Sequence, residues 1–163
     1  MADNDPQTPD NDEHSAEAVA VGSVDVEARI EDIITEAIDA GDTERVRDIV
    51  RELHYADVAD LLERLSREYR ARAVEIIRDI FDPEVLSELD ETVREDVVNA
   101  LGVKEVASAL SELDSDDAVF VLEEMDAAQQ QLYLEHVNEE DRSLIEQGLS
   151  YPEDSAGRLM QRE

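Results

Sequence analysis

The sequence predicts an all-α protein built from stacked pairs of short helices. A five-residue pattern recurs at a constant interval, helix-capping residues fall in register with that interval, and no segment shows the two-residue alternation of a half-buried strand. Short helical pairs cannot bury both of their apolar faces alone. They therefore stack on neighbouring pairs and form an α-solenoid.

Residues 1–23 are expected to form a disordered acidic tail. They contain no lysine or arginine, scattered proline, aspartate and asparagine, and few large apolar side chains. At Val24 the pattern changes to an apolar stripe with helical spacing, which predicts a helix that ends at the turn Ala40-Gly41-Asp42. The members of this stripe are Val24, Val26, Ile30, Ile33, Ile34 and Ile38.

An internal repeat defines a predicted helical-repeat domain over residues 24–150. A Leu-x-x-Leu pattern returns at one fixed interval along the chain, so that its copies are evenly spaced. The copies are Leu62-Glu63-Arg64-Leu65-Ser66, Leu86-Ser87-Glu88-Leu89-Asp90, Leu110-Ser111-Glu112-Leu113-Asp114 and, more loosely, Leu134-Glu135-His136-Val137-Asn138. The segment Ile38-Asp39-Ala40-Gly41-Asp42 is a degenerate fifth copy.

The last residue of every copy is a preferred helix N-cap, so each copy ends one helix and opens another. These caps are Asp42, Ser66, Asp90, Asp114 and Asn138. Apolar residues recur seven and eleven positions after each cap, which places them on one face of the helix that follows. Each unit is predicted to be a first helix of about ten residues, a tight turn and a second short helix.

Composition excludes several classes of function. The chain of 163 residues carries 45 Asp and Glu against 14 Lys and Arg, a net charge of −31. Such a polyanion does not bind nucleic acid and is disfavoured at an anionic membrane surface. The absence of cysteine excludes disulfides and zinc–thiolate sites. Because no apolar run reaches membrane-spanning length and the N-terminus lacks the parts of a signal peptide, we expect one cytoplasmic domain without direct membrane insertion.

The basic residues indicate a saline cytoplasm. Lys104 is the only lysine among the 14 basic residues, and all others are arginine. Molar salt shortens the Debye length to ~3 Å and screens the self-repulsion of an acidic surface. The alternative is an acidic protein of ordinary cytosol, and retention of the fold in low salt would favour that alternative.

Catalytic motifs are not found in the sequence, so the protein is not expected to be an enzyme. His14, His54 and His136 show no metal-ligand spacing with one another, and no phosphate loop or nucleophile elbow is present. Carboxylates remain, and oxygen-only sites bind hard cations such as Mg²⁺ or Ca²⁺. The run Asp114-Ser115-Asp116-Asp117 starts like a calcium loop but lacks its glycine and terminal glutamate. First-turn acids also suit the helix dipole without any ligand.

The chain resembles the cytosolic N-terminal domain of MgtE-type magnesium transporters from about Ala40 to Met160. The resemblance includes Leu53-His54-x-x-Asp57, Glu84-Val85-Leu86-Ser87, Leu113-x-x-Asp116-Asp117 and the closing run Tyr151-Pro152-Glu153-Asp154-Ser155-Ala156-Gly157-Arg158-Leu159-Met160. The closing run is the most specific part, because a similar run in that family joins the helical domain to a pair of CBS domains. Residues 151–163 are therefore predicted to be a junction towards a CBS pair that this chain does not contain.

The resemblance implies a right-handed superhelix, which agrees with the repeat, and a function as a magnesium sensor. In the family, Mg²⁺ ions bridge acidic residues of this domain and the CBS pair and hold the pore shut. When magnesium falls, the carboxylates repel one another, the domain swings away and the pore opens. The resemblance places bridging ligands on Glu84 and Asp116, whereas a further family carboxylate falls on Phe120.

The same resemblance implies particular partners. Mg²⁺ would be bound weakly and shared with a CBS pair, and a transmembrane domain would belong to the same or a companion chain. A homodimer formed through those partner domains is left open. The expected location is the cytosolic face of the cell membrane if the chain is part of a transporter.

Two other interpretations stay open. A short-helix solenoid can also be a stand-alone protein-interaction scaffold without ion dependence. A hydrolase would require two carboxyl groups with split pKa values in one pocket, and no spacing indicates such a pair. A downstream sequence with CBS motifs and apolar spans would favour the magnesium sensor, and an unrelated domain would favour the scaffold.

Overall fold

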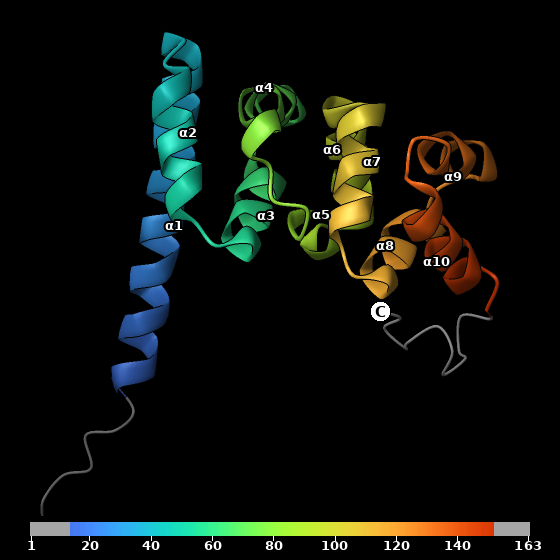
Figure 1. Cartoon of the computed structure of the whole chain (residues 1–163). Coiled ribbons are helices and arrows are strands. Elements are labelled where there is room, and N and C mark those ends of the chain that lie inside the picture. The colour runs from blue at the N-terminus through green and yellow to red at the C-terminus, as the bar shows by residue number, and fades with distance from the viewer. Residues whose placement is uncertain (1–13, 152–163) are drawn as a thin grey trace, which may run out of the picture.

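A computed structural model describes residues 14–151, and every regular element within them is helical, which confirms the all-α class. The elements are α1 (His14–Ala40), α2 (Thr43–Glu52), α3 (Tyr55–Arg64), α4 (Arg67–Ile77), the 3₁₀ turn η1 (Arg78–Ile80), α5 (Val85–Glu88), α6 (Glu91–Leu101), α7 (Val103–Glu112), α8 (Ser115–Glu123), α9 (Ala127–Leu134) and α10 (Glu139–Leu149). Figure 1 shows the helices in a row that follows the chain from α1 to α10.

Adjacent helical pairs stack on one another through equivalent helices. Among the first helices of the pairs, α1 packs on α3, α3 on α5, and α7 on α9; among the second helices, α2 packs on α4, α4 on α6, and α8 on α10. This pattern changes at the α6–α7 connection, where Gly102 alone joins the two helices with φ 89° and ψ 167°. Only glycine adopts this backbone readily. Beyond this turn α5 contacts α8, a second helix of the next pair.

The five predicted caps are the N-caps of α2, α4, α6, α8 and α10. The side chains of Asp42, Ser66 and Asn138 each accept a hydrogen bond from the backbone N–H three residues later. The residues seven positions after the caps point into the core: Ala73, Val97, Val121 and Ile145 are buried, and Ile49 packs against them half-buried. One interval of the sequence repeat therefore corresponds to one helical pair of the stack.

The first helix begins earlier than the sequence predicted. Helix α1 begins at His14, so residues 14–23 of the expected disordered tail are helical. Alanine and glutamate in this stretch have high helix propensity, and a helix already nucleated downstream extends at little cost. Residues 1–13 of the tail and residues 152–163 of the junction lie outside the described residues.

The third pair departs from the expected first helix of about ten residues, because α5 has only four. The chain leaves α4 through η1 and then meets Pro83. Proline has no N–H to donate and pushes the residue before it, Asp82, away from helical geometry. A helix can therefore form only after Pro83, and one short turn remains before the cap at Asp90.

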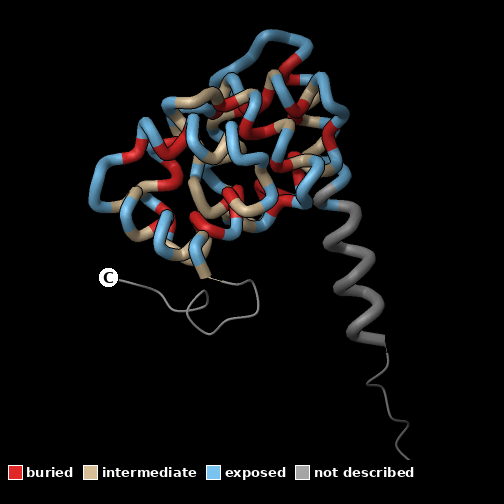
Figure 2. The backbone as a smooth tube through the Cα atoms, turned by 90° about the vertical axis from the view of Figure 1, so that its right-hand side faces the viewer, coloured by how far each residue is buried: buried red, intermediate tan, exposed pale blue. Residues whose placement is uncertain are grey.

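Buried residues are distributed along the whole stack (red in Figure 2). Nearly all of them are aliphatic, but Arg70 and Arg94 are also buried. Arg70 is 9 % exposed and donates from Nε to the carbonyl of Leu62 at 2.8 Å and from Nη2 to that of Leu65 at 3.0 Å. Its Nη1 pairs with Asp96 of the next unit at 2.7 Å. Arg94 repeats the arrangement one unit later. Each arginine thus satisfies carbonyls that the preceding helix leaves open at its C-terminus.

Gly148 lets α10 approach α8 closely. A Cβ at this position would lie 2.5 Å from a methyl carbon of Val119, which is too close for two carbon atoms that are not bonded to each other. We therefore expect Gly148→Ala to lower the free energy of unfolding by about 1–3 kcal/mol despite the better helix propensity of alanine. Chemical denaturation measures this change. In a Val119→Ala background the same substitution should be neutral, and an equal loss there would contradict the packing argument.

Candidate metal centre

The short helix α5 presents Glu84 at its N-terminus. The Asp82 side chain accepts a hydrogen bond from the Glu84 N–H at 3.0 Å, and the Ser87 hydroxyl donates to the Glu84 carbonyl at 2.9 Å. These bonds fix the backbone on both sides of Glu84, whose side chain is half-buried. Glu88 lies exposed at the other end of the same turn.

Helix α8 presents three further carboxylates at its N-terminus. Asp114 is the cap, and Asp116 and Asp117 occupy the first turn. One carboxylate oxygen from each of the three lies within 4.8 Å of the others. Oδ1 of Asp116 is buried and has no hydrogen-bond partner among the described residues. A buried carboxylate oxygen without a partner is costly, so this atom requires a water molecule or a cation as its partner.

The two groups of acids influence one another, because α5 packs against α8. Burial raises the pKa of the Glu84 carboxyl, and repulsion from Asp117 raises it further. Burial likewise raises the pKa of the Asp117 carboxyl, with repulsion from Asp116 next in size. We call these mutually repelling carboxylates the acidic cluster: Asp82, Glu84, Glu88, Asp114, Asp116 and Asp117.

The acidic cluster has the chemistry of a site for a hard divalent cation. Its donors are all oxygens, which Mg²⁺ and Ca²⁺ prefer over the nitrogen and sulfur ligands of other metals. A divalent ion would relieve the repulsion that raises the pKa of Glu84 and Asp117. It would also give the open oxygen of Asp116 a partner.

The structure brings the predicted residues Glu84 and Asp116 onto two helices in contact, each within the electrostatic reach of Asp117. Sequence reasoning did not select Asp114, Asp117 or Glu88 as site residues. The closely spaced aspartates of residues 114–117 carried the signal, but first-turn acids are common without a ligand. The packing of α5 against α8 and the buried Oδ1 of Asp116 distinguish this first turn from the similar acidic turn that opens α10.

Phe120, where the resemblance expected a carboxylate, is 39 % exposed on α8. The guanidinium carbon of Arg94 lies 4.6 Å from the centre of its ring. The aromatic side chain therefore contacts a cation contributed by the chain itself.

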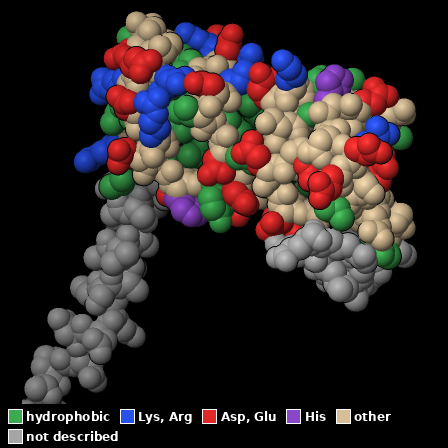
Figure 3. Space-filling view, viewed as in Figure 1, with side chains coloured by type: hydrophobic (Ala, Val, Ile, Leu, Met, Phe, Trp, Pro, Cys, Tyr) green, Lys and Arg blue, Asp and Glu red, His purple; other side chains and the backbone are tan. Residues whose placement is uncertain are grey.

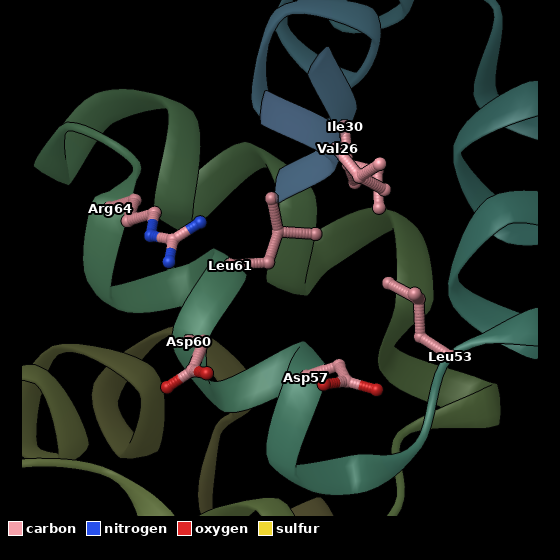
Figure 4. Close-up of a pocket in the computed structure, with 7 residues that line it drawn as sticks. All are labelled: Val26, Ile30, Leu53, Asp57, Asp60, Leu61 and Arg64. Atoms are coloured by element: carbon pink, nitrogen blue, oxygen red, sulfur yellow. The ribbon is translucent and has the colours of Figure 1, made fainter. Parts of the chain in front are cut away.

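A separate apolar groove lies near the N-terminal end of the stack (Figure 4). Its cavity of about 330 Å³ is lined by Val26 and Ile30 of α1, by Leu53 after α2, and by Leu61 of α3, with Asp57, Asp60 and Arg64 at its edge. Val26 is 55 % exposed. Figure 3 shows Lys and Arg gathered mainly over the N-terminal helices, on the side of the molecule that holds this groove.

We expect Asp117→Asn to stabilise the metal-free protein at neutral pH. The pKa of Asp117 is raised in the folded state, so this carboxyl favours folding below its ordinary pKa and loses that contribution as pH rises through the raised value. Removal of the charge should increase the free energy of unfolding and flatten its fall with rising pH. Denaturation at several pH values measures both effects. Glu135→Gln, at an exposed position outside the acidic cluster, is the control and should change neither; a metal-free protein destabilised by Asp117→Asn would contradict the repulsion.

Fold and site together define an all-α repeat domain with a candidate divalent-cation site between its units. A model of the family described as the MgtE intracellular N domain matches residues 53–154, and the chain belongs to this family. Membership of a family of intracellular domains confirms the cytoplasmic location expected from the sequence. Across the described helices, no stretch combines the length and the apolar character of a membrane span.

Known proteins agree with this assignment. The chain is 27 % identical over 116 residues to the magnesium transporter MgtE of Bacillus subtilis (strain 168), a match that covers 70 % of this chain and 25 % of that protein. It is similar to the cytosolic domain of the Mg²⁺ channel MgtE solved in complex with ATP, with a TM-score of 0.67, 27 % identity, and coverage of 80 % of this chain and 54 % of that one. The soluble part of a magnesium transporter shares the fold, with a TM-score of 0.66, 19 % identity, and coverage of 83 % and 54 %. The chain thus spans about a quarter of the transporter's length.

Proposed function

We propose that this chain is a magnesium-sensing regulatory domain of an MgtE-type magnesium transporter, and that the acidic cluster is its Mg²⁺ site. The observation that carries the proposal is the buried, unpartnered Oδ1 of Asp116 among carboxylates that repel one another. Family membership and the similarity to a magnesium transporter make Mg²⁺ the ion of choice among hard cations. The proposed function is binding and regulation, with no catalytic step.

Glu84 and Asp116 are the proposed bridging ligands, and Asp114 and Asp117 complete the donors of this chain. These donors come from one side, whereas Mg²⁺ requires near-octahedral coordination. A CBS pair of the same or a companion chain would supply ligands from the other side. The isolated chain should therefore bind Mg²⁺ weakly, with a Kd of about 1 mM.

The gating mechanism follows from differential affinity. An ion held between two modules stabilises the state in which they are together, and only by the difference in its affinity for the two states. At low magnesium the uncompensated charges of the acidic cluster oppose that state. The modules then separate, and the transmembrane part of the transporter responds. The pore itself requires membrane-spanning elements outside the 14–151 region described here.

A Mg²⁺ titration of the chain followed by NMR tests the proposal. In molar KCl, Mg²⁺ should shift the signals of α5 and of the first turn of α8, and additional KCl of equal ionic strength should not. Glu84→Gln with Asp116→Asn should weaken binding at least tenfold, as loss of bridging ligands does. Glu75→Gln with Glu135→Gln, which alters two exposed acids outside the acidic cluster, is the matched control. Tight binding that survives the first pair of substitutions would refute the assignment.

The second candidate function is an interaction scaffold without ion dependence. The apolar groove between α1 and α3, with Val26 exposed at its mouth, favours this function. The same titration separates the two candidates, because a scaffold would show no response specific to Mg²⁺. A Val26→Asp substitution would then weaken partner binding and leave ion binding unchanged.

A further inference from the structure

Arg94 lies on α6 and contacts both α5 and α8, the two helices that carry the acidic cluster. It is 4 % exposed and donates from Nε to the carbonyl of Leu86 in α5 at 2.7 Å, and from Nη2 to that of Leu89, just after α5, at 2.6 Å. Its Nη1 pairs with Glu124 at the C-terminal end of α8. The ring of Phe120, also on α8, contacts the guanidinium.

These contacts hold together two helices whose charges push them apart. Helix α5 has only four residues, and its buried Val85 and Leu86 anchor it in the core, where it packs on α3. Glu84 at its start is repelled by Asp117 and Asp114 of α8. A buried guanidinium with charge-assisted bonds to both helices opposes this repulsion.

The repeat supplies two comparisons for this arrangement. Arg70 makes the same bonds to the end of α3, but its carboxylate partner is Asp96 on α6, so its bonds connect α3 with α6 and involve neither α5 nor α8. Gln130 bonds from Nε2 to the carbonyls of Leu122 and Met125 at 2.8 and 3.1 Å, so a glutamine at the corresponding position reaches both carbonyls. Glutamine therefore keeps the cap of the preceding helix while removing the charge and the pairing with the next unit.

We infer that Arg94 is a positioning residue that holds α5 against α8 and so sets the mutual arrangement of Glu84, Asp116 and Asp117. Its consequence for metal binding rests on the proposed function. Arg94 does not touch the ion. It acts through the placement of α5, and its own positive charge counts against a cation nearby.

Whether Arg94→Gln weakens or tightens Mg²⁺ binding shows whether Arg94 acts by positioning α5 or by its own charge. If Arg94 acted only by its charge, Arg94→Gln would tighten Mg²⁺ binding, because a cation is removed from the neighbourhood of the site. If Arg94 positions α5, the same variant weakens binding. Phe120→Ala loosens the contact from the α8 side with no change of charge, at an exposed position where the fold tolerates it.

The experiment compares the full chain with Arg94→Gln, Phe120→Ala and the matched control Arg70→Gln, in molar KCl. Amide hydrogen exchange of α5 is measured without metal, and the Mg²⁺ midpoint is measured by NMR. In Arg94→Gln we expect the α5 amides to exchange about tenfold faster and the Mg²⁺ midpoint to rise about tenfold. Phe120→Ala should shift both quantities in the same direction by less. Arg70→Gln should leave both unchanged at α5 and the acidic cluster.

Unchanged exchange of α5 in Arg94→Gln would overturn the inference, whatever the ion does. Mg²⁺ binding that stays equal or becomes tighter would also overturn it, because charge would then explain the effect. If the α5 amides respond as expected but the unmodified chain shows no Mg²⁺-specific shifts, the proposed function fails while the positioning of α5 by Arg94 stands.

Discussion

Dilution of the salt from molar concentration to below ~0.1 M is expected to unfold the chain. The net charge is −31, and between Arg94 and Tyr151 the only Lys or Arg residues are Lys104 and Arg142. In molar salt the short Debye length screens the repulsion among these acids, whereas in dilute salt it acts across the whole domain. Circular dichroism should show loss of most helical signal on dilution, with recovery when KCl is restored.

A charge variant provides the control for this prediction. Glu75, Glu95 and Glu135 are exposed and lie outside the acidic cluster. Replacement of all three by lysine should move the unfolding midpoint to lower salt, because each change shifts the net charge by two units. An unmodified chain that keeps its circular dichroism spectrum in low-salt buffer would refute the expected adaptation to a saline cytoplasm. In that case the unmodified chain would have no salt-dependent unfolding midpoint with which to compare the lysine variant.

Loss of the buried Arg70 of the second pair should lower the stability of the fold far more than loss of an exposed polar side chain. Arg70→Ala leaves the carbonyls of Leu62 and Leu65 without their partner and removes the buried half of the pair with Asp96. Breaking a buried pair by removing one partner costs about 3 kcal/mol or more, a large part of the stability of a small domain. Denaturant unfolding in molar KCl measures the loss.

Arg72 is the matched control for this substitution. It lies two residues away on α4, pairs with Asp39 at 3.4 Å and donates to the carbonyl of Ile38 at 3.0 Å, but its side chain is 43 % exposed. Exposed pairs contribute about 0–1 kcal/mol, so Arg72→Ala should cost far less than Arg70→Ala. Equal losses in the two variants would show that burial of Arg70 does not matter.

The parts of the fold that depend on local pattern were predictable from the sequence. The caps at Asp42, Ser66 and Asn138 repeat in register with the Leu-x-x-Leu pattern, and each opens a helix in the structure. The buried arginines were not predicted, because an arginine inside an amphipathic helix ordinarily indicates its solvent side. The signal was present in the position of Arg70 and Arg94, each four residues after a cap.

The candidate site was predicted less completely, because it depends on contacts between units. The resemblance placed ligands on Glu84 and Asp116, but no spacing indicated that α5 would pack against α8 rather than follow the stacking of the earlier pairs. That contact depends on the single-residue turn at Gly102 and on the short α5 after Pro83. Asp117 becomes a candidate ligand only when the turn at Gly102 and the short length of α5 are both known.

Replacement of Mg²⁺ by paramagnetic Mn²⁺ is the most direct test of whether the acidic cluster is a specific cation site. Mn²⁺ has the same preference for oxygen ligands and broadens the NMR signals of nearby amides. If the acidic cluster is the binding site, sub-stoichiometric Mn²⁺ in molar KCl broadens the amides of α5 and of the first turn of α8 before all others. The first turn of α10, with Glu139, Glu140 and Asp141, is an internal control with as many acids as the cap and first turn of α8 together. Equal or earlier broadening there would contradict a specific site and leave only general attraction of cations to an acidic surface.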